Sequence, residues 1–486
     1  MPDPMLIGID LGTTRLKVAA FDVEGNLLAR EADRNVEHRE GDREWQEPDE
    51  WWETLARLCR RLLEHTAVAG REVAGVGLSG RGGGFVALDE RGDVVVESWS
   101  DRRHRHHLQQ LYEWREGGIF LPNYTAALLA KHLWLREAEP VAAERVARIM
   151  YAKDFLLHRI TGEVVTDPSS GPDRDDFDRP SISTLGLDPG ILPRVDLPWS
   201  IAGTVTAEAA ETLGIAPGTP VAVGAHDGVC ANVGAGAGRP GAYAITVGTN
   251  MVVRAVVEDS PPGAFRFYGM PPGRHVIGGN AFMAGRAGDW FLDAWRDRPD
   301  EAHRPAAFAE MDVEAGAVPV GADGVTFLAL LSGEQLPVPR PEATGAFTGL
   351  RARHGRAEMY RALLEGSACA LRAVFEQVRG WCGEPRIVRF TGGGALSATW
   401  RQIIVDVLDQ PCEATDGSAE ARGAAIYAAV ALGYYGDVDE AADAMVRPTS
   451  LVEPDPRRAR AYKPVYRRWL AVREALRPLD EAEAAP

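Results

Sequence analysis

The stretch "IDLGTT", residues 9–14, has the residue types of a phosphate-binding turn. Gly12 lets the backbone pass close to an anion, and Thr13 and Thr14 offer hydroxyl and N–H donors. Asp10, expected at a strand end, can hold a hydrated Mg²⁺ ion. Similar Asp-Leu-Gly-Thr turns occur in hairpins without ligands, so this stretch alone leaves both a phosphate loop and an ordinary hairpin open.

A second acid, Asp227 in "GAHDG", has the setting of a carboxylate that a substrate can reach. It ends an apolar stretch and is bracketed by glycines, so a substrate can approach it directly. Aspartate is also suited to capping a helix N-terminus, and both roles can hold together. His226, the preceding residue, either touches the substrate or tunes Asp227, or it is a packed, hydrogen-bonded histidine, and the last interpretation is favoured.

Three consecutive glycines, Gly392, Gly393 and Gly394 in "FTGGG", stand between an expected strand and an expected helix. A nucleotide can lie against the exposed backbone of such a turn. The alternative is a plain turn between strand and helix. Three glycines are more permissive than a plain turn requires, so the nucleotide interpretation is favoured.

The elements that position these residues follow from the spacing of apolar residues. Residues 5–20 alternate around the first Gly-Thr turn and predict a β-hairpin. Helical spacing predicts helices over residues 49–66 and 126–147, with a buried strand at residues 72–80. Residues 219–238 indicate a strand, a glycine-rich turn and a helix of small residues, which places Asp227 at the turn.

The segment "GAYAITVGTNMVVRAVVE" repeats the opening layout, with Gly248 and Thr249 in place of the first Gly-Thr pair and Asn250 next. A repeat about half a chain away suggests two lobes of one design, each starting with a hairpin. We therefore predict an N-terminal lobe over residues 1–242 and a C-terminal lobe over residues 243–486.

Composition excludes several classes of protein. The 486 residues carry a formal net charge of -17, which argues against nucleic acid or an anionic membrane as partner. The five cysteines are far apart and form no CxxC pair, so neither a disulfide framework nor a structural zinc site is indicated. No signal peptide and no apolar stretch of about 18 residues is found, and a cytoplasmic protein is expected.

Ten segments, in order, resemble the FGGY carbohydrate kinases of the actin-like ATPase superfamily, such as xylulose, gluconate and glycerol kinases. They are "IGIDLGTTRLKVAAFD", "EWQEPDEWW", "GVGLSGRGGG", "ESWSDRR", "AKHLWL", "YAKDFLLHRITGE", "GAHDGVCANVGAGAG", "ITVGTN", "GAFTGLRARHGRAEMYRALLEGSACALR" and "FTGGGALSATWRQIIVDVL". The resemblance implies an α/β fold of two actin-like (ribonuclease H-like) lobes. Each would be a mixed β-sheet flanked by helices, with an ATP cleft between the lobes.

The activity implied by this resemblance is ATP-dependent phosphorylation of a small sugar, polyol or sugar acid, with a ketopentose such as xylulose or an aldonate such as gluconate favoured. Asp227 would be the general base, and Asp10 and Asp227 would be the carboxylates for Mg²⁺. The ATP phosphates would lie along residues of both Gly-Thr turns, namely Asp10, Gly12, Thr13, Thr14, Gly248, Thr249 and Asn250. Adenosine would lie near Gly392, Gly393 and Gly394.

The run "RGGGF" departs from the family pattern, in which a Gln and bulky or charged residues commonly contact the acceptor. Arg81, Gly82 and Gly83 predict a roomier pocket in which Arg81 can meet an anionic substrate. The alternative is that Arg81 forms an ion pair elsewhere and the glycines only make a turn. His226 stands where a small residue is frequent, and Asn250 replaces the usual Ser.

The segment "WSDRRHRHH" keeps the family-like spacing that makes Asp101 and Arg103 candidates for the substrate side of the site. The three histidines at the end of this segment, His104, His106 and His107, suit a solvated helix face better than a metal site, because no carboxylate or cysteine set accompanies them. The alternative functions are a non-catalytic member of the superfamily and a sugar-sensing regulator, although no helix-turn-helix is evident. The oligomeric state stays open, and a homodimer is one candidate.

Overall fold

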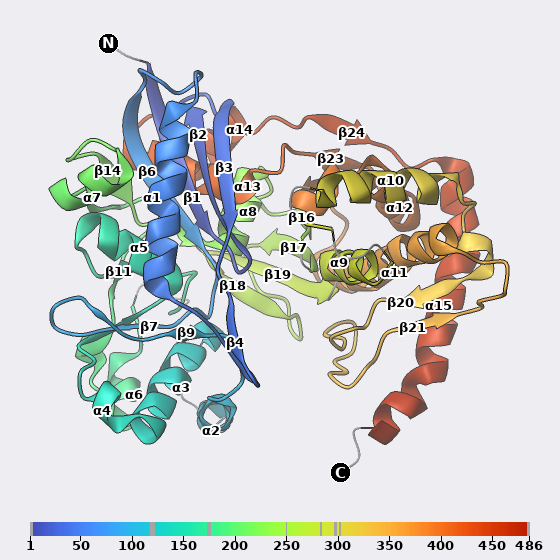
Figure 1. The fold of residues 1–486 in the computed structure, drawn as a ribbon, viewed down its shortest axis with the longest axis horizontal. Coiled ribbons are helices and arrows are strands. Elements are labelled where there is room, and N and C mark those ends of the chain that lie inside the picture. The colour runs from blue at the N-terminus through green and yellow to red at the C-terminus, as the bar shows by residue number, and fades with distance from the viewer. Residues whose placement is uncertain are drawn as a thin grey trace. The chain divides into compact units, whose positions relative to one another are not determined.

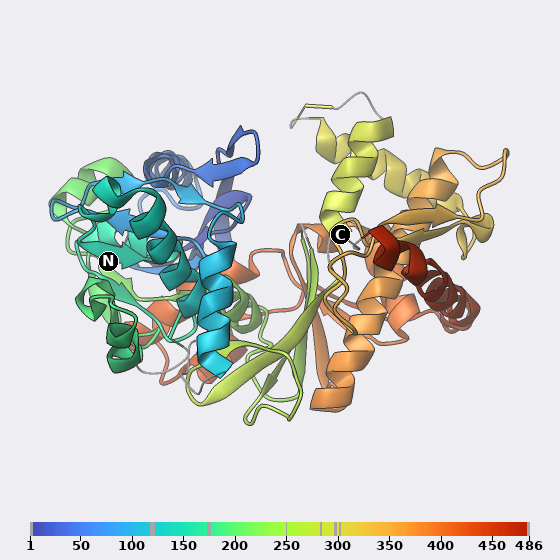
Figure 2. The same cartoon turned by 90° about the horizontal axis from the view of Figure 1, so that it is seen from below.

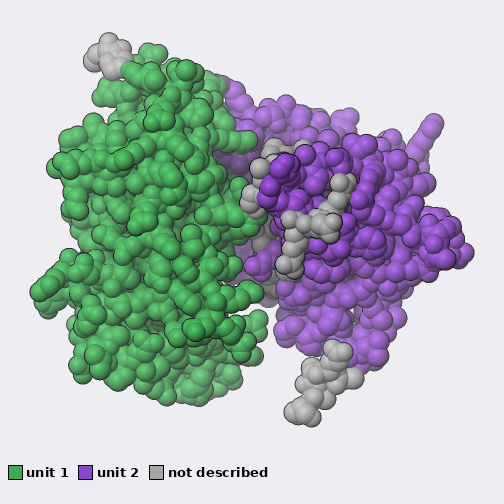
Figure 3. Space-filling model, in the orientation of Figure 1, with its two compact units in different colours: residues 1–236, 268–274, 419–446 green, residues 237–267, 275–418, 447–486 purple. Residues whose placement is uncertain are grey.

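The computed structural model describes residues 3–116, 122–172, 176–248, 250–281, 284–295, 299–300 and 303–483. Its chain forms two compact units, shown in two colours in Figure 3. Unit 1 contains residues 1–236, 268–274 and 419–446, and unit 2 contains residues 237–267, 275–418 and 447–486. No helix in the described ranges is long and apolar enough to cross a membrane.

The sheet of unit 1 brings three strand ends to one edge. Strand β1 (Pro4–Leu11) runs antiparallel to β2 (Arg15–Asp22) and parallel to β6 (Glu72–Gly80), and β15 (Ala225–His226) runs parallel to β6. The register pairs Asp10 with Ser79 and His226 with Gly80. The expected hairpin and buried strand are confirmed. The strand order of the sheet is β13-β14-β6-β1-β2-β3. Its remaining strands are β13 (Ile201–Thr204), β14 (Pro220–Ala222) and β3 (Leu27–Arg34).

Helices cover both faces of this sheet (Figure 1). On one face lies α1 (Pro48–Glu64), which buries Trp51, Leu55, Leu58 and Leu62 at helical spacing. On the other lie α8 (Asp227–Gly234) and α13 (Ala419–Ala431), which contact each other, and α13 also packs on β1 and β6.

Helix α13 belongs to unit 1, although the sequence suggested two continuous lobes divided between residues 242 and 243. The helix packs on the sheet of unit 1 because glycines let the two backbones come close. A Cβ atom on Gly8 would lie 1.8 Å from the carbonyl oxygen of Ala421, and one on Gly77 would lie 1.9 Å from that of Ala424. Only strands without side chains at these positions can accept the helix at this distance.

The helix expected over residues 126–147 is shorter in the structure. It is α3 (Asn123–Ala138), which ends before Pro140, the first residue of the short helix α4 (Pro140–Ala143). The remaining elements of unit 1 are β4 (His38–Glu40), β5 (Arg43–Gln46), β7 (Val86–Leu88), β8 (Val94–Val96), β9 (Ser98–Trp99), β10 (Arg148–Met150), β11 (Val165–Thr166), β12 (Arg194–Val195), α2 (Arg105–Glu116), α5 (Ala152–Thr161), α6 (Arg179–Thr184), α7 (Ala207–Leu213) and α14 (Val438–Met445).

Unit 2 repeats the strand arrangement of unit 1. Strand β16 (Ala242–Val247) is antiparallel to β17 (Met251–Val257) and parallel to β22 (Ile387–Thr391), as β1 is to β2 and β6. The predicted repeat of the hairpin is therefore confirmed. The sheet continues with β19 (Arg274–Ala281), β23 (Cys412–Ala414) and β24 (Ser450–Val452). Of β18 (Arg266–Met270), the residues from Tyr268 onward belong to unit 1.

Helix α11 (Arg356–Cys382) of unit 2 packs along β17 of this sheet (Figure 2). Its middle is buried, and Gly366 lies so close to β20 (Thr326–Leu328) that a Cβ atom there would be 2.1 Å from the Phe327 carbonyl oxygen. The other elements are β21 (Ala346–Thr348), α9 (Ala284–Trp295), α10 (Arg304–Ala317), α12 (Ala398–Leu408) and α15 (Pro456–Glu483).

Candidate functional site

Side-chain amides donate hydrogen bonds to the backbone of the turn between β1 and β2. The Asn35 amide donates to the carbonyl oxygens of Gly12 (2.8 Å) and Thr13 (3.1 Å), and the Gln46 amide donates to that of Thr13 (3.0 Å). Thr13 and Thr14 are exposed. Because the carbonyls are engaged by these amides, the turn presents exposed threonines on a fixed backbone, as a phosphate site requires. Asn35 was not identified from the sequence, because no local motif marks it.

Asp10 is buried in a cluster of charged groups. Its Oδ1 accepts from the Ser79 hydroxyl (2.8 Å), and its Oδ2 lies 3.0 Å from Lys17 Nζ, which lies 3.5 Å from Glu420 Oε2. Burial raises the pKa of Asp10 to about 6; Lys17 opposes this, whereas the charges of Glu420 and Asp227 add to it. Asp10 is therefore ionised at neutral pH and within electrostatic reach of Asp227.

Sequence reasoning missed both partners of Asp10. Lys17 lies directly opposite Asp10 across the β1–β2 hairpin, so the hairpin register contained the necessary signal. Glu420 comes from α13, about 400 residues further along the chain, and nothing local predicts its place.

Asp227 is the first residue of α8, and it is half-buried. The cap of this helix is His226, whose Nδ1 accepts from the N–H of Gly228 (3.0 Å). The sequence offered Asp227 itself as the capping residue, and this is wrong because the helix begins at Asp227, one residue earlier than that role needs. His226 Nδ1 also lies 3.0 Å from Asp227 Oδ1.

The His226 ring is packed between two tyrosines. Its centroid lies 4.9 Å from that of Tyr124 and 4.4 Å from that of Tyr268. A Cβ atom on Gly82 would lie 2.4 Å from Tyr124 Cε1 and 2.6 Å from His226 Nε2. The space beside Gly82 is therefore filled by these rings, and the idea that this glycine enlarges the pocket is wrong. Gly83 has a φ of +75°, a conformation that favours glycine.

Arg81 lies beside the phosphate turn. Its guanidinium stacks over the Trp51 ring at 5.2 Å and donates a weak bond to the Thr13 carbonyl (3.4 Å). Burial lowers the pKa of Arg81 to about 10, while the charges of Asp227 and Glu37 act in the opposite direction. Within the described part of the chain Arg81 forms no ion pair with a carboxylate, so the alternative in which it pairs elsewhere is not observed.

Asp101 and Arg103 are bound to each other. Arg103 Nε donates to both carboxylate oxygens of Asp101 (2.8 and 3.0 Å), and the N–H of Glu44 donates to Oδ2 (3.0 Å). Burial acts to raise the pKa of Asp101, but the hydrogen bonds from Arg103 outweigh it and lower the pKa to about 2. The guanidinium also lies 3.0 Å from Glu97 Oε1. This pair braces the loop after β9, and its role toward a substrate stays a prediction.

The histidines after Arg103 have separate partners. His104 Nδ1 accepts from the Trp99 indole (3.3 Å), His106 contacts Gln110 (3.0 Å), and His107 contacts Glu137 (3.0 Å). In the ranges that the structure describes, no group of three potential metal ligands occurs.

Lys131, on α3, is a buried base that sequence reasoning missed. Its Nζ donates to the carbonyl oxygens of Trp99 (2.6 Å) and Gly83 (3.2 Å). Burial, helped by the charge of Arg81, lowers its pKa to about 7. Among the described residues no carboxylate lies within ion-pair distance of it. Lys131 and Arg81 thus place two basic groups at the "RGGGF" loop without a paired acid.

The three glycines proposed to lie near adenosine, Gly392, Gly393 and Gly394, differ in whether packing or backbone conformation requires a glycine. Gly392 has a φ of +85°, and a Cβ atom on Gly394 would lie 2.6 Å from Val247 Cγ1. Gly393 is exposed, with open space where a Cβ atom would be. Packing therefore explains two of the three glycines, and Gly393 offers exposed backbone.

The hydrogen bonds at the two Gly-Thr turns differ in span. The N–H of Gly248 donates to the carbonyl oxygen of Asn250 (3.0 Å), two residues on, whereas that of Gly12 donates to Arg15 (3.0 Å), three residues on. Thr249 lies outside the described residues.

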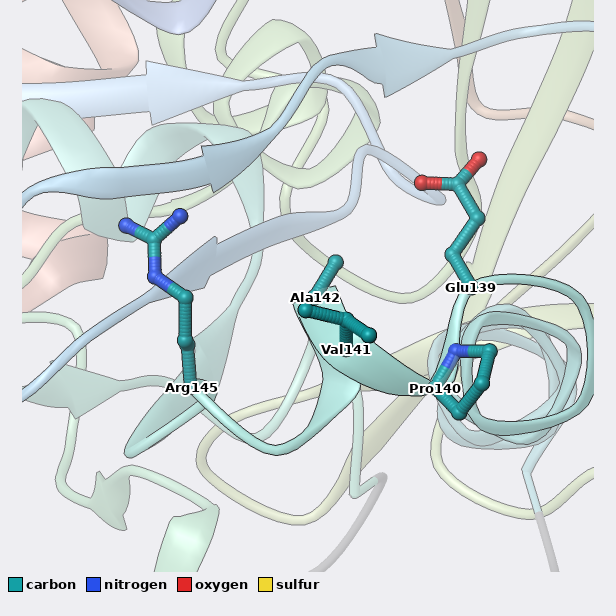
Figure 4. Close-up of a pocket in the computed structure, with 5 residues that line it drawn as sticks. All are labelled: Glu139, Pro140, Val141, Ala142 and Arg145. Carbon is teal, nitrogen blue, oxygen red and sulfur yellow. The ribbon is translucent and has the colours of Figure 1, made fainter.

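A shallow hollow on α4 lies apart from these residues. It is lined by Glu139, Pro140, Val141, Ala142 and Arg145 (Figure 4). In the figure the Glu139 carboxylate and the Arg145 guanidinium stand at opposite ends, and Arg145 pairs with Asp89 (3.3 Å). This hollow contains none of the candidate residues.

Comparison with known proteins decides the family. The model of the FGGY family of carbohydrate kinases, N-terminal domain, matches residues 5–234, and that of the C-terminal domain matches residues 244–432. The chain belongs to this family. The FGGY resemblance drawn from the sequence is thereby confirmed, and the chain is a carbohydrate kinase.

Individual FGGY relatives match over almost their whole length. The chain is 26% identical to a xylulose kinase of Staphylococcus epidermidis, with 97% of each chain covered. It is 25% identical to a gluconokinase of Bacillus licheniformis, covering 97% of this chain and 96% of the relative. The crystal structure of xylulose kinase from Rhodospirillum rubrum superposes with a TM-score of 0.81 at 26% identity, covering 98% of this chain and 100% of that one. The predicted α/β fold of two actin-like lobes is confirmed.

Proposed function

We propose that this FGGY kinase transfers the γ-phosphoryl group of ATP to a hydroxyl of a small sugar or sugar acid, with Asp227 as general base. The observation that supports this most is the position of Asp227, half-buried at the start of α8 and coupled by charge to Asp10 and Arg81. As the acceptor oxygen bonds to phosphorus, its proton passes to the Asp227 carboxylate and the bond from phosphorus to the ADP oxygen breaks.

The neighbouring histidine is held by the backbone of α8. His226 Nδ1 accepts the Gly228 N–H (3.0 Å) and lies 3.0 Å from Asp227 Oδ1, so the ring is fixed beside the proposed base. We retain His226 as a candidate contact for the acceptor.

The residues around Asp10 fit a magnesium ion. The charges of Glu420 and Asp227 both act on Asp10 to raise its pKa, and the charge of Lys17 acts in the opposite direction. Mg²⁺ prefers carboxylate oxygen and water, so Asp10 and Asp227 would hold it. When bound, the ion would neutralise charge on the ATP phosphates. Thr13, Thr14, Gly248, Thr249 and Asn250 would bind the phosphates, and Gly393, with its glycine neighbours, would lie near adenosine.

The acceptor class is suggested by the "RGGGF" loop. Arg81 and Lys131 lie there without an ion-paired carboxylate in the described part of the structure. Such groups favour a carboxylate of the substrate, so an aldonate such as gluconate is our first candidate. A ketopentose such as xylulose is the second. Since kinases use the cytoplasmic ATP pool and all five cysteines are free thiols, we place the reaction in the cytoplasm.

Release of ADP from the purified protein tests this function. Pentuloses, polyols, aldonates and glycerol are supplied in turn with Mg²⁺ and ATP, and ADP is expected only when an accepted sugar is present. ADP release that is equal without any acceptor, or absent with all of them, would favour a non-catalytic or sugar-sensing protein. A clear preference for a neutral polyol over the corresponding aldonate would contradict the anionic pocket.

The titration of Lys131 makes a further prediction about pH. The pKa of Lys131 is lowered to about 7, so its positive charge is present below that pH and is lost as the pH rises through it. We expect KM for gluconate to rise over this range, while KM for xylulose stays nearly constant. Steady-state kinetics with both sugars check this.

A Lys131→Gln variant should lose this difference between the two sugars. The matched control is Lys463→Gln, which removes an exposed lysine of α15 and should leave the profile unchanged. A parallel rise in both KM values would show that another group titrates.

A further inference from the structure

A buried polar segment that the proposed mechanism does not use contacts the turn of residues 223–227, which ends at Asp227. We call this turn the catalytic corner. The buried segment is formed by residues 167–170, which follow β11. Asp167 is fully buried and accepts from the backbone N–H of Ser169 (2.8 Å) and of Ser170 (3.3 Å). Both serine hydroxyls also donate to its carboxylate, Ser169 to Oδ2 and Ser170 to Oδ1.

One of these serines reaches the residue next to Asp227. Ser169 Oγ accepts from the backbone N–H of His226 (3.1 Å). Because its own proton is donated to Asp167, the hydroxyl turns a lone pair toward His226, and the bond has a fixed direction. The carboxylate polarises the hydroxyl and strengthens this acceptor. Ser170 has the same hydroxyl bond to Asp167 but none to the catalytic corner.

Lys153 also binds the catalytic corner, through the backbone of Val223. Its Nζ lies 2.8 Å from Asp154 Oδ1 and 3.5 Å from Asp167 Oδ1, and it donates to the carbonyl oxygen of Val223 (3.0 Å). The network therefore grips the chain at residues 223 and 226, on either side of Gly224. That glycine has a φ of +72°, and a Cβ atom there would lie 1.8 Å from the Leu78 carbonyl oxygen.

We propose that Asp167 and Ser169 are positioning residues that set the direction of the Asp227 carboxylate through the backbone of His226. The inference rests on the proposed role of Asp227 as base. Displacing a reacting group by about 1 Å can cost roughly a hundredfold in rate, so the loss of one hydrogen bond at this corner is expected to affect turnover. Binding of ATP and sugar involves other groups and is expected to change little.

The test compares Ser169→Ala with Ser170→Ala. Each variant removes one buried hydroxyl bond to Asp167, and Ser169→Ala also removes the acceptor of the His226 N–H. Both should therefore lower the thermal unfolding midpoint, Ser169→Ala by more than Ser170→Ala. Only Ser169→Ala should lower kcat, by roughly tenfold, with KM for ATP and for the sugar nearly unchanged. Equal effects of the two variants on kcat, or no effect of either, would overturn the proposal and leave the segment a purely structural role.

A double-mutant cycle separates this proposal from the assignment of the base. If Ser169 acts through Asp227, Ser169→Ala should cause no further loss of kcat in an Asp227→Ala background. A full tenfold loss in that background would show that Ser169 acts independently of Asp227, which would overturn the proposal. Near-normal turnover of Asp227→Ala alone would instead refute the base and, with it, the positioning role. If Ser169→Ala does not fold, Ser169→Cys takes its place, with a smaller loss expected.

Discussion

Replacing Asp227 by alanine is expected to lower kcat for sugar phosphorylation by roughly three orders of magnitude, because it removes the carboxylate proposed to take the proton of the acceptor hydroxyl. Asp227→Asn should be about equally impaired, since the amide keeps the shape of the side chain but cannot accept the proton. ADP release in the presence of saturating sugar and ATP measures both variants.

Nucleotide affinity is the control for this prediction. Asp227 lies on α8 of unit 1, whereas Gly392, Gly393, Gly394 and Asn250 belong to unit 2, so ATP binding should be nearly intact in Asp227→Ala. Asp42→Ala, which removes an exposed acid between β4 and β5, is the matched surface variant and should be fully active. Turnover near that of the unmodified protein in Asp227→Ala would refute the base assignment.

Asp10→Asn is expected to lower kcat/KM for ATP by at least about a hundredfold, because it removes the carboxylate proposed to hold Mg²⁺. The pKa of Asp10 is raised to about 6, so activity of the unmodified protein should fall as the pH drops through this value and the carboxylate takes up a proton. Initial rates over a range of Mg²⁺ concentration and pH measure both effects.

The Asp10→Asn variant is expected to lose activity without losing stability. Because the pKa of Asp10 is higher in the folded protein than in the unfolded chain, the ionised carboxylate costs stability that builds up as the pH rises from about 4 to about 6. At neutral pH the thermal midpoint of Asp10→Asn should therefore be equal to or higher than that of the unmodified protein. A large drop in the midpoint would show that the ion pair with Lys17 matters more than burial.

The parts of the fold that could be predicted are those that local pattern controls. Alternation around Gly12 and Gly248 predicted both hairpins, and helical spacing predicted α1. The position of α13 could not be predicted, because it depends on the absence of side chains at Gly8 and Gly77, far away in the sequence. A glycine in a strand does not reveal which element will approach it.

The candidate site shows the same division. Asp10 and Asp227 could be selected because each stands near a strand end and a glycine, and the charge of Asp227 acts on the pKa of both Asp10 and Arg81. That Asp101 and Arg103 satisfy each other was not predictable from spacing, since two charged residues two positions apart can also point away from one another. The space beside Gly82 was misjudged because the rings of Tyr124 and His226 come from elsewhere in the chain.

The late return of α13 to unit 1 has a consequence for synthesis on the ribosome. The glycine-lined face of β1 and β6 is covered by a helix that ends at Ala431, whereas the strands themselves are made within the first 80 residues. Through most of translation this apolar face stays open to solvent and to other nascent chains. The N-terminal unit can reach its final packing only after nearly the whole polypeptide has emerged, so its maturation is expected to be post-translational.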